Sequence, residues 1–186
     1  DDRFTLKRSP EGYIEQTQQG RKGRGLLRVY LGYAAGTGKT YAMLAAARGL
    51  HAEGRDVVVG LVESHGREGT AALLEGLPAL PRRTIEYPGR TLTEFDLDAA
   101  LERCPQILLV DELAHTNVGE GRHPKRWGDV LELLEAGIEV HTTLNVQHLE
   151  SVADVLPGAT GATVAELAPD ILLEQAQEIV LIDLPP

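Results

Sequence analysis

The sequence predicts an α/β fold in which a mainly parallel central sheet is flanked by helices. Short β-prone runs alternate with helix-prone stretches along the chain, and this alternation is typical of parallel strands joined by crossover helices. Several of the β-prone runs are apolar at nearly every position, as at 57–62 and 107–110. Strands have this pattern when both of their faces are buried, so we expect helices on both sides of the sheet.

The alternation gives the expected elements in order. Strands are expected at residues 26–31, 56–62, 83–87, 106–111, 139–143 and 178–183. Helices are expected at residues 40–52, 68–75, 96–103, 127–136, 147–155 and 170–176. Right-handed crossovers bring most strand C-termini to one edge of the sheet, where open α/β folds bind ligands. The residues just after each strand are therefore the candidates for chemistry.

Length and composition indicate one folded domain. The chain has 186 residues, of which 42% are hydrophobic, enough for one sizeable core and few for two. Residues 1–25 are polar with little periodicity, so we expect a flexible N-terminal lead there and the domain at 26–186. The net charge of −10 argues against a nucleic-acid partner, because affinity for phosphate backbones needs clustered Lys and Arg.

Two further features bear on location. The single cysteine, Cys104, excludes an internal disulfide and fits a reducing cytoplasm. No run approaches the roughly 18 to 20 apolar residues that cross a bilayer, and the N-terminus lacks the apolar core of a signal peptide. The chain is therefore expected to be soluble and cytoplasmic.

The most informative segment is residues 32–40, Gly-Tyr-Ala-Ala-Gly-Thr-Gly-Lys-Thr, between a β-prone run and an Ala-rich helical one. This is the setting of a phosphate-binding P-loop, in which Lys39 reaches the terminal phosphates and the Thr40 hydroxyl joins a Mg²⁺ shell. The strict pattern has glycine at the position of Tyr33, whereas the following Gly-x-Gly-Lys-Thr core is intact. We therefore expect a nucleoside triphosphate with Mg²⁺. The candidate nucleotide-binding residues are Gly36, Thr37, Gly38, Lys39, Thr40 and Tyr41.

Two acids follow the apolar run at 107–110, in the form of a Walker B strand. Asp111 is the candidate for the shell of a Mg²⁺ held through the nucleotide, and Glu112 is a candidate catalytic residue that positions water for attack on the γ-phosphate. Capping of a following helix is the alternative role for an acid at a strand end. Together, the loop and the acid pair predict a three-layer sandwich of the P-loop NTPase type.

Other strand ends also carry polar groups. Glu63 follows the strand at 56–62 and is a second candidate catalytic carboxylate, which would orient water. Thr143 ends the strand at 139–143 and Asn145 follows it; both are candidate sensors of the phosphate state. Helix capping explains Asn145 equally well.

A basic cluster lies beyond the acid pair, at Arg122, Lys125 and Arg126. Arg122 and Arg126 are candidates for sensing a γ-phosphate, for an arginine finger toward a neighbouring subunit, or for docking an acidic partner. The alternative is a solvated loop whose basic residues flank the start of a helix.

Five stretches in order resemble the N-terminal cytoplasmic domain of the KdpD family, which comprises potassium- and turgor-responsive sensor histidine kinases. They are residues 32–44, 62–67, 109–117, 122–127 and 143–150. The resemblance implies ATP binding by Gly36, Gly38, Lys39 and Thr40, with Asp111 near Mg²⁺. Family members usually have Ala and Pro where this chain has Tyr33 and Ala35, so these two residues bear on nucleotide affinity.

In that family the domain is a regulatory ATP-binding module, followed by a universal-stress-protein-like domain, a membrane segment and a histidine kinase core. The resemblance therefore implies ATP, the remaining domains of a membrane-anchored sensor kinase controlling potassium uptake, and other cytoplasmic signalling proteins as partners. It does not imply that residues 26–186 phosphorylate histidine.

Three functions stay open from the sequence. The first is a regulatory ATP-binding domain of a sensor kinase, with at most slow hydrolysis. The second is a free-standing P-loop ATPase or small-molecule kinase, which Glu112 and the acidic strand ends favour. The third is a non-catalytic interaction module with a degenerate loop, which docks through residues 122–126.

Overall fold

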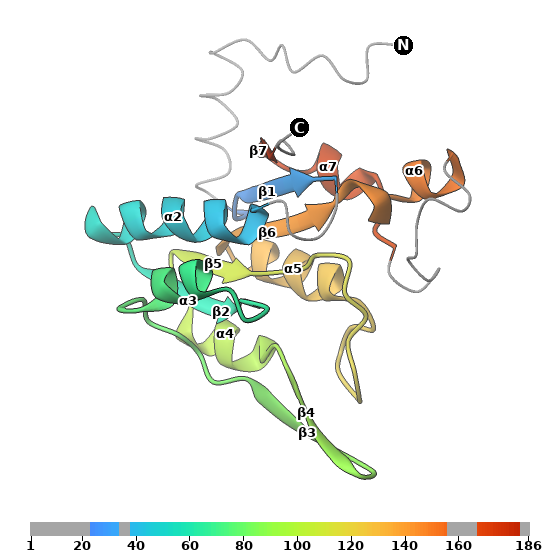
Figure 1. Ribbon diagram of the computed structural model, residues 1–186, viewed down its shortest axis with the longest axis horizontal. Helices are drawn as coiled ribbons and strands as arrows, with labels where there is room; N and C mark the ends of the chain where they lie inside the picture. Colours follow the sequence, from blue (N-terminus) through green and yellow to red (C-terminus); the bar gives the residue numbers. More distant parts are fainter. Residues whose placement is uncertain (1–22, 34–37, 156–166, 183–186) are drawn as a thin grey trace.

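A computed structural model describes residues 23–33, 38–155 and 167–182 of the chain. The apolar runs form one sheet of five parallel strands, in the order β2-β5-β6-β1-β7 (Figure 1). The α/β class and the mainly parallel sheet are thus confirmed. The strands are β1 (Leu27–Gly32), β2 (Val57–Leu61), β5 (Ile107–Val110), β6 (Glu139–Asn145) and β7 (Glu178–Ile182).

Helices cover both faces of this sheet and make it the middle layer of a three-layer sandwich. One face carries α2 (Lys39–Ala52) and α3 (Glu68–Leu74). The opposite face carries α4 (Leu97–Arg103), α5 (Arg126–Glu135) and α7 (Ile171–Glu174).

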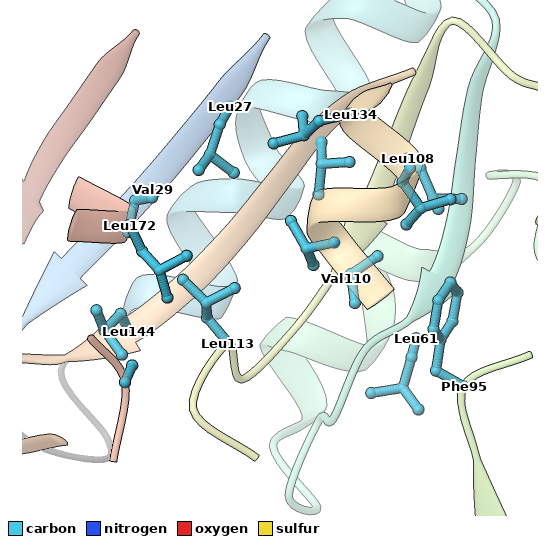
Figure 2. Close-up of a cluster of buried hydrophobic side chains, with 14 of the residues drawn as sticks. Leu27, Val29, Leu61, Phe95, Leu108, Val110, Leu113, Leu134, Leu144 and Leu172 are labelled. Carbon is cyan, nitrogen blue, oxygen red and sulfur yellow. The ribbon is translucent and has the colours of Figure 1, made fainter. Parts of the chain in front are cut away.

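The strands show this division because successive side chains point to opposite faces. Val57 of β2 packs in the cluster that includes Met43 of α2, whereas its neighbour Val58 packs in the cluster that includes Leu133 of α5. Figure 2 shows part of the second cluster, with Leu108 and Val110 of β5 beside α5. Full burial of such a side chain stabilises the fold by roughly 1.5–3 kcal/mol. The two apolar layers therefore hold the sheet from both sides.

Strand register brings the predicted functional segments to one edge of the sheet. Gly32, the last residue of β1, pairs with Asn145 of β6. Val110, the last residue of β5, pairs with Thr142 of β6. Asp111 therefore leaves β5 next to the end of β6, at the edge from which the chain also leaves β1. This is the carboxyl edge at which parallel α/β sheets bind ligands.

The strand expected at 83–87 is confirmed as a strand, but its expected place in the parallel run is wrong. β3 (Arg83–Tyr87) pairs antiparallel with β4 (Arg90–Glu94), a strand that was not expected, and this hairpin extends away from the sheet (Figure 1). Pro88 and Gly89 form its turn, where Gly89 has φ 82°. Proline followed by a glycine at positive φ is the pairing that such a tight turn favours.

The helix expected at 147–155 is interrupted. A 3₁₀ turn, η1 (Val146–His148), precedes α6 (Glu150–Val155), and Leu149 between them is extended. Leu149 forms a bridge with Ala168, and this pairing competes with continuous helix at that point. None of the helices in the described ranges is both long and apolar enough to span a membrane.

The packed domain begins at or before Gly25. The Gly25 N–H donates to the Leu134 carbonyl oxygen at 2.6 Å. A Cβ at Gly25 would lie 1.9 Å from the Ile138 carbonyl oxygen, so only glycine fits this approach. Residues 1–22 of the expected lead lie outside the described residues.

Candidate functional site

The start of α2 supplies the first part of the site. Gly38 precedes the helix with φ 91°, a left-handed conformation that favours glycine. Lys39 is buried, and Thr40 beside it is half-buried. Tyr41, the next candidate, is exposed on the same turn. Two other candidates, Gly36 and Thr37, lie outside the described residues, as does Ala35.

Asp111 is the centre of the site, with 1% of its surface exposed. The Thr40 hydroxyl oxygen lies 3.3 Å and 3.2 Å from the two carboxylate oxygens. The Thr143 hydroxyl donates to Oδ1, and the backbone N–H of Glu63 donates to Oδ2 at 3.1 Å. The ends of β2, β5 and β6 and the start of α2 therefore converge on one carboxylate.

Burial raises the pKa of the Asp111 carboxyl above its usual range, because the site removes the charged form from water. Hydrogen bonds from Thr143, from the Glu63 N–H and from Thr40 oppose this, whereas the charge of Glu112 adds to it. Burial likewise lowers the pKa of the Lys39 ammonium; the charge of Arg67 acts in the same direction, and Asp111 and Glu112 oppose it. Burial thus disfavours the charged form of both side chains at this edge.

Glu112 is held in place at both its backbone and its side chain. It has φ 58°, a left-handed conformation that is uncommon for a residue other than glycine, and its N–H donates to the Thr143 hydroxyl at 3.0 Å. Its carboxylate lies 3.1 Å from Nε2 of His65. His65 itself has φ 48°. The carboxylate therefore faces the loop after β2, at the rim of the site.

These groups line a cavity of about 330 Å³ at the carboxyl edge of the sheet. This volume lies at the lower end of the range for small-ligand sites. The lining includes Lys39, Arg67, Asp111, Glu112, Asn145 and His148. The predicted residues Gly38, Lys39, Thr40, Asp111, Glu112 and Asn145 are thus brought together in one cavity.

Glu63 is placed differently from the other candidates. Its backbone N–H reaches Asp111, but its carboxylate accepts a hydrogen bond from Arg82 at 2.8 Å. Its side chain is not among the groups that line the cavity in the described part of the chain. The structure therefore shows Glu63 positioning Asp111 through its backbone, with its side chain turned to Arg82.

Arg126 is almost fully buried, with 2% of its surface exposed. Its guanidinium donates to the Asp111 carbonyl oxygen at 3.0 Å and to the Glu94 carboxylate at 3.1 Å. Burial lowers the pKa of Arg126, while the charge of Glu94 opposes this. A guanidinium in this position cannot reach a partner, so the docking and arginine-finger roles expected for the cluster do not extend to Arg126.

Arg122 is exposed and lies away from the Asp111 cavity. It forms ion pairs with Asp98 at 2.9 Å and Glu132 at 3.3 Å. It lines a second cavity of about 350 Å³, together with Arg83, Asn117 and Asp129. The structure therefore separates the two arginines that the sequence grouped as one cluster.

Glu94 supports the site, but it was not predicted as a site residue from the sequence. It is buried at the end of β4 and accepts hydrogen bonds from His115 at 2.7 Å, from the Val118 N–H at 2.9 Å and from Arg126. Desolvation raises the pKa of the Glu94 carboxyl, but His115, the Val118 N–H and Arg126 lower it. The pKa of Glu94 is therefore below its usual value. The Pro88-Gly89 turn was the available sequence signal, since it predicts the hairpin that carries Glu94.

The fold and the site together define the class of protein. It is a doubly wound α/β domain with a polar cavity at the carboxyl ends of its strands. Residues 23–186 match the family described as KdpD, osmosensitive K+ channel His kinase sensor domain, and the chain belongs to that family.

Relatives agree with this assignment. The chain is 55% identical over 181 residues to the sensor protein KdpD of Escherichia coli. The matched residues make up 97% of this chain and 20% of that protein. It is 50% identical over 169 residues to the sensor protein KdpD of Clostridium acetobutylicum, covering 91% and 19%. The KdpD sensor protein of Mycobacterium tuberculosis H37Rv is 50% identical over 163 residues, covering 88% and 19%. The chain thus spans about a fifth of the length of these relatives.

Proposed function

We propose that this domain binds ATP with Mg²⁺ at the cavity lined by the start of α2 and by residues at the ends of β5 and β6, and that it serves as a regulatory domain of a sensor histidine kinase. One observation carries the proposal: the Thr40 hydroxyl lies within hydrogen-bond distance of both carboxylate oxygens of Asp111. A hydroxyl after a loop lysine, together with an acid at a strand end, is the pair that a nucleotide-bound Mg²⁺ requires.

The phosphates would lie at the start of α2. Lys39 supplies a cation there, and the 14-residue helix directs its positive end toward the same point. The candidate loop residues Gly36 and Thr37 are part of this proposal, with their backbone N–H groups as donors to phosphate, although both lie outside the described residues. The net charge of −10 makes a local cationic site the feature that attracts an anionic ligand.

The residues present fit a Mg²⁺ ion. The Asp111 carboxylate contacts hydroxyl groups and a backbone N–H. Of these groups, the oxygens of Thr40 and of Asp111 itself are hard ligands of the kind that Mg²⁺ prefers. Burial raises the pKa of Asp111, and a nearby cation would favour its charged form. When bound, the ion neutralises phosphate charge; Thr40 and Asp111 would hold its shell.

The role is regulatory, with at most slow hydrolysis. Of the two candidate catalytic carboxylates, Glu112 and Glu63, only Glu112 lines the cavity within the described ranges, and it is paired with His65. Arg126 is buried beneath Asp111 and is not placed for transition-state charge. The relatives are named sensor proteins, and this chain spans about a fifth of their length. We therefore assign histidine phosphorylation, potassium control and membrane anchoring to the parent protein's other parts, with this domain on the cytoplasmic side.

The position of Glu112 favours a second candidate, a P-loop ATPase that turns over on its own. Phosphate release separates the two functions. Slow or no release by the wild-type chain supports the regulatory domain, and steady release that Glu112→Gln abolishes supports the ATPase.

Calorimetric titration of the 186-residue chain with ATP, ADP and GTP in Mg²⁺ tests the proposal. We expect saturable ATP binding that Lys39→Ala removes, because the ammonium is the cation at the phosphate end of the cavity. Arg90→Gln is the charge-matched control, since Arg90 lies over Tyr87 on the hairpin. Absence of binding by the wild-type chain would leave the non-catalytic interaction module as the function.

A further inference from the structure

Arg67 differs from every other arginine of the described ranges. No hydrogen bond or ion pair joins its guanidinium to another residue in those ranges. Each of the other described arginines contacts a carboxylate, an amide or carbonyl oxygen, or an aromatic ring. In a chain with 28 acids and 18 Lys and Arg residues, acidic partners are plentiful. An arginine without one, at a cavity, is therefore free to take an anionic ligand.

The position of Arg67 is fixed by the loop that precedes it. The Glu63 N–H donates to Asp111, and the His65 ring lies 3.1 Å from the Glu112 carboxylate, so the loop is tied twice to the end of β5. His65 and Gly66 have φ 48° and 72°, and these two left-handed residues turn the chain. Arg67 follows at the cavity, where its N–H donates to the Ser64 carbonyl oxygen at 3.0 Å.

Arg67 and Lys39 line the same cavity, and Arg67 is close enough to Lys39 to affect its charge state. The other cationic side chains near this edge are already engaged. Arg126 holds Glu94 and the Asp111 carbonyl oxygen, and the Lys125 ammonium donates to the Ala114 carbonyl oxygen at 2.6 Å. Two adjacent cations repel one another unless an anion lies between them, so this arrangement suits a ligand with more than one phosphate charge.

We propose that Arg67 contacts the γ-phosphate of the nucleotide and makes the site discriminate ATP from ADP. This inference rests on the proposed nucleotide binding at Lys39 and Thr40. An arginine can donate two hydrogen bonds in a fixed plane to phosphate oxygens, which the single ammonium of Lys39 cannot do. ADP lacks the terminal phosphate and leaves Arg67 without its ligand.

A contact between Arg67 and the γ-phosphate would also affect the neighbouring helices. Arg67 immediately precedes α3, and α3 is attached to α2 at its other end, where Arg48 donates to the carbonyl oxygens of Leu73 and Glu75. A Cβ at Gly69 of α3 would lie 3.8 Å from the Tyr41 ring of α2. Binding of a γ-phosphate to Arg67 would therefore fix the start of α3 against the start of α2.

Calorimetric titration of the 186-residue chain with ATP and with ADP, both in Mg²⁺, tests the inference. Arg67→Gln should weaken ATP binding by roughly ten-fold or more and change ADP binding by less than about two-fold, because it removes charge-assisted bonds to the γ-phosphate alone. Arg67→Lys should recover part of the ATP affinity. Arg90→Gln, which removes the same charge from the hairpin, should leave both affinities unchanged.

The outcomes separate the two proposals. If Arg67→Gln weakens ATP and ADP equally, or weakens neither, the γ-phosphate contact is refuted while nucleotide binding stands. If the wild-type chain binds neither nucleotide, both proposals fail. Thermal melting supplies a further check. Arg67→Gln should have the same melting temperature as the wild type, and a large loss of stability would contradict the absence of a protein partner for Arg67.

Discussion

The Thr40 hydroxyl oxygen lies 3.2 Å from Oδ2 of Asp111, although the two residues are 71 positions apart in the chain. Thr40 is in the first turn of α2, and Asp111 is the first residue after β5. Their approach depends on β6, which lies between β5 and β1 and pairs with both. The sheet order therefore joins the loop segment and the acid segment into one site.

We predict that Thr143→Val destabilises the domain and that Thr142→Val does not. Thr143 donates to the buried Asp111 carboxylate and accepts from the Glu112 N–H, so valine leaves both groups without this partner. The expected loss is roughly 1–3 kcal/mol of unfolding free energy.

Thr142 is the matched control on the same strand. It is fully buried, and its hydroxyl has no hydrogen-bond partner, so valine should be neutral or stabilising. Urea denaturation of the two variants measures the difference. Equal free energies of unfolding for Thr143→Val and Thr142→Val would show that the Asp111 contact contributes nothing.

We predict that Arg126→Met is among the most destabilising substitutions at this edge. The change removes the cation from Glu94, which is 3% exposed, and the donor from the Asp111 carbonyl oxygen. Breaking one side of a buried ion pair typically costs roughly 3–5 kcal/mol. Chemical denaturation should show a loss of this size.

A double variant tests the cause of that loss. Glu94→Gln combined with Arg126→Met should recover part of the stability, because the buried charge is then gone from both sides. Arg122→Met, in an exposed ion pair of the same loop, should change stability by less than about 1 kcal/mol. A small effect of Arg126→Met would contradict the structural role of the buried guanidinium.

We predict that His141 makes the domain less stable below about pH 6.5. His141 is fully buried on β6, with Nε2 2.8 Å from the Glu139 carboxylate and Nδ1 without a partner. Burial lowers its pKa below 6.5, with the charge of Arg28 in the same direction and Glu139 opposing it. Between the folded and unfolded pKa values the unfolded chain binds more protons, so stability falls as pH is lowered.

The slope that one such group adds is at most about 1.4 kcal/mol per pH unit. Urea denaturation between pH 7.5 and 5.5 should therefore show a shallower dependence for His141→Gln than for the wild type. His51→Gln, at the exposed end of α2, serves as the control. Parallel pH profiles for the wild type and His141→Gln would mean that His141 does not contribute.

The parallel sheet could be predicted because its strands carry a local signal. The runs of β2 and β5 are apolar at almost every position, and the structure buries each of their residues. The run of β3 alternates between half-buried and exposed residues, which marks a strand outside that sheet. Its pairing with β4 was not predicted, because the signal for it is the Pro88-Gly89 turn and not the hydrophobic pattern.

The candidate site could be predicted only in part. The strand-end rule placed Asp111, Glu112 and Asn145 at one cavity with Lys39, because each lies at the end of a strand or at the start of a helix at the same edge. The burial of Arg126 could not be predicted, since its partners Asp111 and Glu94 lie 15 and 32 residues away and belong to different elements. The availability of Arg67 likewise depends on which carboxylates the other arginines occupy.

Backbone amide NMR of the 186-residue chain, titrated with ATP in Mg²⁺, tests nucleotide binding at this edge most directly. Saturable shift changes are predicted at Gly38, Lys39 and Thr40 and at Asp111 and Glu112, which line the same cavity. Saturable changes confined to Arg83, Asn117 and Asp129, around the second cavity, would contradict the assignment of the site. No change at millimolar ATP would contradict nucleotide binding itself.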